Sequence, residues 1–132
     1  MKRAALAALL GAALLAGCAT PTPAPGTGWS RAPDLSVYSA MTLFAGIART
    51  ESSLCGGFRP ATVEEYWHED FAAREQAVIS VLIARHGPEA VDAAEADAVA
   101  TRRVSCPDVP TLRWRREYAR LLHLLEMRLG LA

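Results

Sequence analysis

The chain has 132 residues, of which 52% are hydrophobic and 21% charged, with 14 basic and 14 acidic side chains. This length indicates one globular domain, and a formal net charge of zero argues against a nucleic-acid partner. Lys2 is the only lysine, which excludes lysine-based chemistry such as Schiff bases from the rest of the chain.

The N-terminus has the features of an export signal. Lys2 and Arg3 come first, and a run without charged side chains follows up to Ala16. A run of this kind is too short for a membrane-spanning helix, which needs about 20 residues. A charged start, a short apolar run and small residues before a cut are typical of secretory signals, so we expect residues 1–17 to be removed.

The segment Leu15-Ala16-Gly17-Cys18 resembles the processing site of bacterial lipoproteins. In that class the signal is cut before the cysteine, and the cysteine is acylated. The resemblance implies that Cys18 begins the mature chain and carries the lipid that attaches it to a membrane. Ala19 follows where an aspartate favours the inner membrane, which implies the periplasmic face of the outer membrane. The alternative is an ordinary secretory signal in which Cys18 falls near the cut by chance.

Residues 18–33 have the composition of a spacer. They contain four prolines and two glycines: Pro21, Pro23, Pro25, Pro33, Gly26 and Gly28. Alternating prolines favour an extended path, and glycine loosens it. Trp29 is the one large apolar residue of this linker, and it could pack on the domain, lie among lipid headgroups, or do neither.

Residues 34–132 predict a helical domain, and its first half contains two helices. Apolar residues recur every three or four positions from Val37 to Cys55, with Asp34 as a cap and Gly56-Gly57 as the end. The second helix follows Pro60 and ends at Gly87. Thr62 and Glu65 have the spacing of a capping box, and the apolar run from Val78 to Ile83 predicts burial on nearly all sides.

The second half of the domain predicts two more helices. Pro88 suits the first position of the third helix, which has a narrow face of small residues such as Ala94 and Ala98. The prolines at 107 and 110 break the helical pattern after Cys106. The fourth helix is expected from about Thr111 to Leu129, with a wide apolar face. The fold class is therefore all-α, as an up-down four-helix bundle.

Cys55 and Cys106 are the two cysteines that remain after Cys18. An even pair in an oxidising compartment predicts a disulfide. An up-down bundle places the ends of its first and third helices together, which agrees with this pairing. The alternative is a redox or metal-binding pair, but the Cys-x-x-Cys spacing is absent.

The same end of the bundle is expected to gather arginines opposite an acidic start of the second helix. These arginines are Arg102, Arg103, Arg113, Arg115 and Arg116. One interpretation is salt bridging to Glu64, Glu65, Glu69 and Asp70. The other is a site for an anion, such as a lipid phosphate or the acidic surface of a partner.

Catalytic and metal motifs are weak in this sequence. Glu65 and His68 match half of the Glu-x-x-His arrangement of metal-binding bundles, but His86 and His123 have no glutamate three residues before them. No Gly-x-Ser-x-Gly motif is present. The four large aromatics of the second and fourth helices are expected in the core, or alternatively around a pocket: Trp67, Phe71, Trp114 and Tyr118.

These observations predict a lipid-anchored periplasmic protein without enzymatic activity, metal or cofactor. Its expected role is binding or scaffolding of an envelope protein partner. The alternative is a helical bundle that binds a small molecule or a metal.

Overall fold

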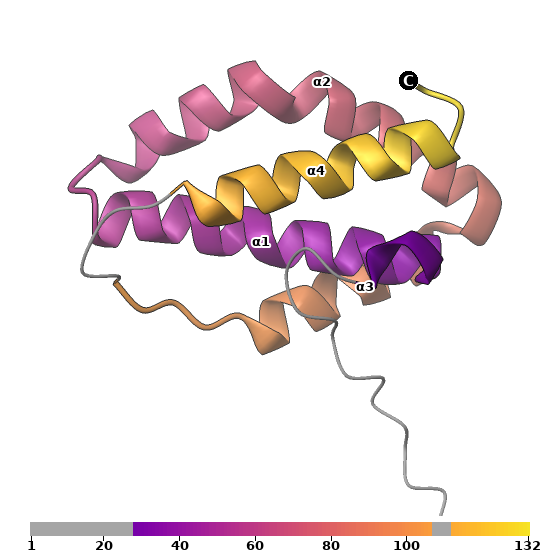
Figure 1. The fold of residues 1–132 in the computed structure, drawn as a ribbon, viewed down its shortest axis with the longest axis horizontal. Helices are drawn as coiled ribbons and strands as arrows, with labels where there is room; N and C mark the ends of the chain where they lie inside the picture. Colours follow the sequence, from indigo (N-terminus) through magenta and orange to yellow (C-terminus); the bar gives the residue numbers. More distant parts are fainter. Residues whose placement is uncertain (1–27, 107–111) are drawn as a thin grey trace, which may run out of the picture.

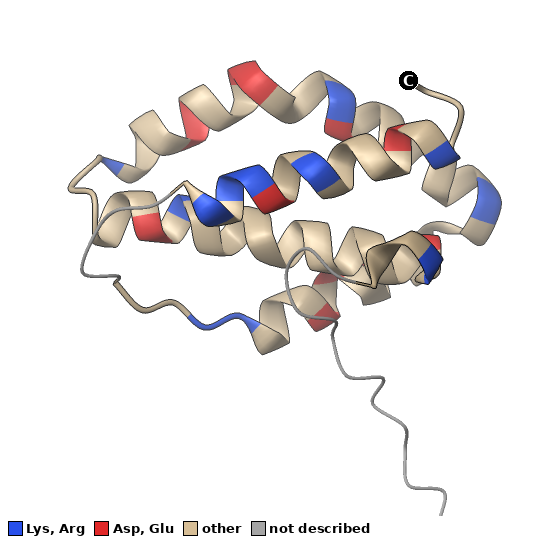
Figure 2. Ribbon diagram, viewed as in Figure 1, with Lys and Arg blue, Asp and Glu red and all other residues tan. Residues whose placement is uncertain are grey.

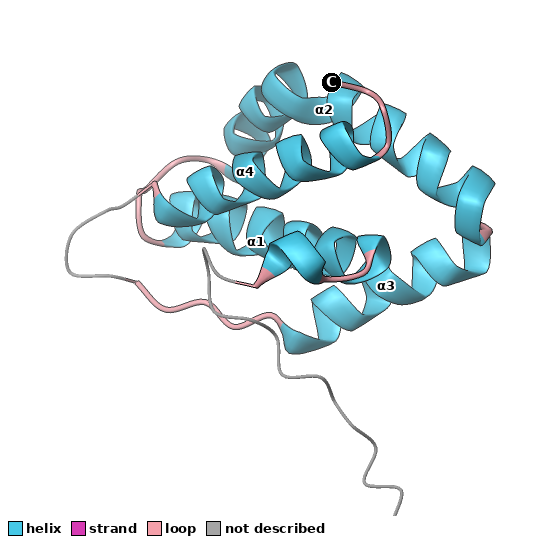
Figure 3. Ribbon diagram, turned by 45° about the vertical axis from the view of Figure 1, so that its right-hand side comes forward, coloured by secondary structure: helices cyan, strands magenta, loops and turns pink. Residues whose placement is uncertain are grey.

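The computed structural model describes residues 28–106 and 112–132. The predicted signal, Cys18 and most of the linker lie outside these ranges. The described elements are a short 3-10 helix, η1 (Trp29–Arg31), and four α-helices: α1 (Asp34–Leu54), α2 (Pro60–His86), α3 (Pro88–Thr101) and α4 (Arg113–Arg128). Successive α-helices run in opposite directions (Figure 1), and no strand occurs in the described ranges (Figure 3). The predicted all-α, up-down four-helix bundle is confirmed.

The starts of two helices differ from the prediction. Helix α2 begins at Pro60, which has no backbone N–H to satisfy, and Thr62 already lies inside its first turn. The predicted capping box is therefore wrong. Helix α1 begins at Asp34 itself, and neither helix has a side-chain cap. Between α2 and α3, Gly87 has a φ of 87°, a conformation that favours glycine and allows the tight turn.

Helix α1 is the central element of the bundle, because its packing against α4 and α3 is the most extensive between any two of the described helices. Its middle turns are buried on nearly every side, and small residues there, such as Ala45 and Gly46, let neighbours approach closely. The sequence predicts that the second half of α2 is buried on nearly all sides, and this prediction is wrong. Val78 and Leu82 are buried, whereas Ile83 is 39% exposed, since α2 forms an outer layer (Figure 1).

The core at the middle of α2 and α4 is aromatic. The rings of Trp67, Phe71 and Tyr118 lie within 4.6–4.8 Å of one another, centre to centre. The Tyr118 hydroxyl donates a hydrogen bond to Glu75, and the Trp67 indole N–H donates to the same carboxylate at 3.5 Å. Burial, and then the bond to Glu75, raises the pKa of Tyr118, so its hydroxyl remains a donor at physiological pH.

Trp29 packs on the domain, which decides among the three alternatives for this residue. It is 2% exposed, and its ring meets that of Phe44 edge-on at 6.5 Å. The guanidinium of Arg128, at the end of α4, donates to the carbonyl oxygens of Trp29 and Ser30 at 2.8 and 2.7 Å. The packed unit therefore includes residues that the sequence assigned to the end of the linker.

A buried carboxylate couples α2 to α4. Arg74 donates two hydrogen bonds of 2.7 Å to Glu126. These bonds hold the pKa of Glu126 below its ordinary value of 4.5. The pair therefore contributes its full share of the unfolding free energy above pH 4.5, and that share is lost as the pH falls through the lower folded pKa.

Replacing Glu126 with glutamine is expected to flatten the acid side of the stability profile. Glutamine takes up no proton, so the part of the pH dependence that comes from this carboxyl disappears. Urea unfolding of both proteins between about pH 5 and pH 2 measures the difference. Equal slopes in the two proteins would contradict a lowered Glu126 pKa.

Candidate binding site at the disulfide end

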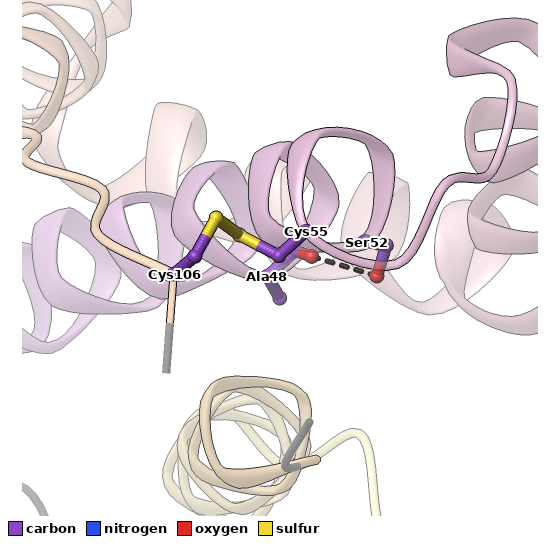
Figure 4. The surroundings of a disulfide bond; sticks show 4 residues. All are labelled: Ala48, Ser52, Cys55 and Cys106. Carbon is purple, nitrogen blue, oxygen red and sulfur yellow. Dashed lines mark hydrogen bonds between the residues drawn. A yellow bond between two sulfur atoms is a disulfide. The ribbon is translucent and has the colours of Figure 1, made fainter. Parts of the chain in front are cut away.

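The predicted disulfide is present and closes one end of the bundle. Cys55 caps the C-terminus of α1, and Cys106 lies on the extended segment after α3, with their Cα atoms 5.4 Å apart. Figure 4 shows this bond beside Ser52, whose hydroxyl donates to the carbonyl of Ala48 at 2.9 Å. The bond fixes the last turn of α1, which forms a wall of the pocket described next.

A pocket of about 660 Å³ lies beside the disulfide. It is bounded by the last turns of α1, the loop to α2, the first turns of α2 and the start of α4. Its described lining residues are Ala48, Glu51, Ser52, Leu54, Cys55, Gly56, Phe58, Thr62, Val63, Tyr66, Trp67, Asp70, Cys106, Leu112, Trp114 and Arg115. The lining is mainly apolar and aromatic, as is typical of small-molecule sites.

Four large apolar side chains of this lining are exposed, and we call them the apolar rim: Leu54, Phe58, Tyr66 and Leu112. Each of them is between 58% and 71% exposed. Scattered exposed apolar residues are normal, but a group around one concave site marks a binding surface. The remaining exposed large apolar residues of the described chain, such as Val99, line no part of this pocket.

Two tryptophans form the inner part of the pocket. Trp67 is 6% exposed, and Trp114 is half-buried with its ring 5.2 Å from that of Phe44. Of the aromatics expected in the core, Phe71 and Tyr118 are buried outside the lining, and Trp67 serves both the core and the pocket. The aromatic group was predicted to lie in the core or around a pocket, and each prediction holds for some of its members.

Glu51 is the buried charged residue of the pocket. It is 8% exposed, and Ala48 and Cys55, three residues before and four after it, line the pocket too. Residues at this helical spacing share a face, so the pocket wall is the face of α1 that carries Glu51. Within residues 28–106 and 112–132, the Glu51 carboxylate has no hydrogen-bond or ion-pair partner.

The predicted group of arginines does not form one site, because its members have different contacts. Arg115 pairs with Asp70, which is the α4–α2 salt bridge that the sequence suggested. The Arg102 side chain lies against α1, where its Nη1 is 3.1 Å from the point that a β-carbon on Gly46 would occupy. Arg113 lies over the ring of Trp114 at 5.0 Å, while Arg103 and Arg116 are exposed. Figure 2 shows the basic residues of α4 gathered mainly in its first half.

The histidines lie away from the pocket. His68, His86 and His123 are all exposed, and none of them lines it. The part of the chain that the structure describes contains no group of three histidine, cysteine, aspartate or glutamate side chains able to hold a metal ion. None of the described helices is both long and apolar enough to cross a bilayer.

Sequence reasoning missed Glu51 and the apolar rim. Glu51 lies in the polar stretch Thr50-Glu51-Ser52-Ser53, which resembles a solvated helix end. The signal that could have found it was its position four residues before Cys55, on the same helix face as a predicted disulfide. The rim joins residues from α1, α2 and two loops, so no single helical stripe predicts it.

Comparisons of the chain with protein-family models, curated proteins and solved structures found no significant match.

Proposed function

We propose that this protein is a lipid-anchored binding protein of the bacterial cell envelope that holds a small, largely apolar molecule in the pocket beside the disulfide. The observation that carries the proposal is the pocket itself, about 660 Å³ in volume and surrounded by the apolar rim. Pockets that bind small molecules typically enclose about 300–1,000 Å³ and are lined by apolar and aromatic side chains with few polar groups.

The membrane attachment in this proposal rests on the sequence Leu15-Ala16-Gly17-Cys18. The thiol of Cys18 would carry the lipid, and the periplasmic face of the outer membrane would hold the domain. Two chemical signals of the N-terminus support it, the charged start and the small residues before the cysteine. Replacing Cys18 with serine is expected to move the protein from the membrane fraction, and retention of the variant there would contradict lipid attachment.

Membrane attachment and ligand binding would use opposite ends of the bundle. The chain enters the domain at η1, which Arg128 holds at the end of α4. The pocket lies at the opposite end of α1, whose 21 residues span about 31 Å. A tether that joins the domain at η1 enters it at the end away from the pocket, which supports entry of a ligand from the aqueous side.

Binding without a chemical reaction fits the polar groups of the pocket. The Ser52 hydroxyl donates a hydrogen bond to the backbone carbonyl of Ala48, and Asp70 forms an ion pair with Arg115. A serine nucleophile needs a base within hydrogen-bond reach, and no histidine is among the described lining residues. Scaffolding of an envelope protein through the exposed arginines remains the second candidate, favoured by Arg103 and Arg116 on the surface.

Filling the pocket is expected to abolish binding. The probe is the neutral 2-(1-naphthyl)ethanol, measured by calorimetry with the full chain in phosphatidylcholine nanodiscs and with empty nanodiscs as the blank. The double substitution Ser52→Phe, Thr62→Trp places two rings in the lining and should weaken binding at least about tenfold, or about 1.4 kcal/mol. The control Val99→Phe adds a ring at an exposed position outside the pocket. Undetectable binding to the unsubstituted chain, or equal binding to both variants, would contradict the proposal.

A further inference from the structure

We infer that the ligand of this pocket is cationic: an amine or quaternary ammonium group on an apolar body, with Glu51 as its counter-charge. This inference rests on the proposed binding function and specifies the class of molecule that the pocket takes. It starts from the juxtaposition of an acidic residue, Glu51, and aromatic side chains in the lining of one cavity.

The first step is the state of Glu51. The residue is 8% exposed and lines the pocket, and no hydrogen-bond or ion-pair partner of its carboxylate lies in the described ranges. Its oxygens are not among the fully enclosed atoms of the described chain that lack a partner, so within those ranges the carboxylate is accessible from the pocket. An ionised carboxylate only accepts hydrogen bonds, and it pairs with donors or cations. A ligand that brings an N–H donor or a positive charge into the pocket would supply the missing partner.

The second step is that two arginines of the surrounding helices, Arg115 and Arg49, are already engaged. Arg115 pairs with Asp70, and its guanidinium carbon lies 4.8 Å from the ring centre of Phe71. Arg49 pairs with Glu64 at 2.9 Å and lies over the ring of Trp67 at 5.4 Å. Both side chains therefore have partners other than Glu51.

The third step is the charge and chemistry of the wall. Among its described residues, the two carboxylates of Glu51 and Asp70 outnumber the one guanidinium of Arg115, which leaves a formal charge of −1. Tyr66 and Trp114 belong to the same lining. Aromatic faces attract ammonium groups, so the wall favours a cation over an anion of the same shape.

The test compares three probes that share one apolar body and differ in charge: 2-(1-naphthyl)ethylammonium, 2-(1-naphthyl)ethanol and 1-naphthylacetate. Calorimetry uses the full chain in phosphatidylcholine nanodiscs. We expect the ammonium to bind about tenfold more tightly than the alcohol, or about 1.4 kcal/mol, and the carboxylate to bind most weakly. The substitution Glu51→Gln keeps the size of the side chain and should remove the preference. Glu65→Gln, at an exposed carboxylate outside the pocket, should retain it.

The outcomes separate this inference from the function on which it rests. Equal binding of ammonium and alcohol, or tightest binding of the carboxylate, overturns the cationic ligand and leaves an apolar-ligand pocket in place. Absence of binding by all three probes overturns both proposals. The comparison on the unsubstituted chain needs no variant, so it stands even if Glu51→Gln fails to fold. A preference that survives in a folded Glu51→Gln protein also overturns the role of Glu51.

Discussion

Removal of the Cys55–Cys106 disulfide is expected to lower the unfolding free energy by about 4 kcal/mol, the largest effect that we predict for any covalent change in the domain. The bond closes a loop with a sequence separation of 51 residues. Without it, the unfolded chain regains the conformational entropy of that loop, whereas the folded chain gains little conformational entropy. The unfolded state is therefore favoured more than before. The expected loss is a large part of the about 5–15 kcal/mol that stabilises a typical domain.

The measurement is urea unfolding of the double variant Cys55→Ala, Cys106→Ala beside the unsubstituted chain. A reducing agent should destabilise the unsubstituted chain by a similar amount. The same reagent should leave the double variant unchanged, which serves as the control. A difference below about 1 kcal/mol would mean that the loop is already restrained in the unfolded state.

Replacing Phe71 with alanine is expected to cost about 3–5 kcal/mol of unfolding free energy. Phe71 is 6% exposed, and its ring centre lies 4.8 Å from that of Trp67 and 4.7 Å from that of Tyr118. Truncation removes the buried ring and leaves a cavity between α2 and α4, which two fixed aromatic neighbours cannot close. The loss combines the transfer free energy of the ring with the free energy of the cavity.

Urea unfolding measures this loss, and Tyr66→Ala on the same helix is the matched control. Tyr66 is 60% exposed, so its truncation should change the unfolding free energy by no more than about 0.5 kcal/mol. Equal costs for the two substitutions would contradict the position of Phe71 in the core.

Much of the fold could be predicted because helical periodicity is a local property. The steps of three and four residues located all four helices, and Gly87 with Pro88 located the turn between α2 and α3. The disulfide could be predicted because the topology brings Cys55 and Cys106 to one end. Such inferences need only the pattern within a helix and the alternation of helix directions.

The order of layers could not be predicted in the same way. The apolar run in α2 has more large side chains than the middle of α1, yet α1 is the central helix. Small buried residues of α1, such as Ala45 and Gly46, favour close approach of its neighbours, and the Arg102 side chain lies against Gly46. Helix-on-helix approach depends on the fit of two surfaces, and the sequence of one helix does not contain the shape of its neighbour.

The pocket could not be predicted because it is made by elements far apart in the sequence. Glu51 on α1, Tyr66 on α2 and Trp114 on α4 meet only in the folded chain. The aromatic residues were expected in the core or around a pocket. The sequence could not show which of them, Trp67 and Trp114, line the pocket at the disulfide end of the bundle. Trp29 is a similar case, because its contacts are with Phe44 and Arg128, which lie far from it in the sequence.

The most direct measurement is the two-dimensional NMR spectrum of the three indole N–H groups during titration with 2-(1-naphthyl)ethylammonium. Trp67 and Trp114 line the pocket, whereas Trp29 is buried against Phe44 outside it. A ligand in the pocket should shift the signals of Trp67 and Trp114 and leave that of Trp29 in place. Unchanged signals for Trp67 and Trp114 at saturating probe would contradict a binding site beside the disulfide.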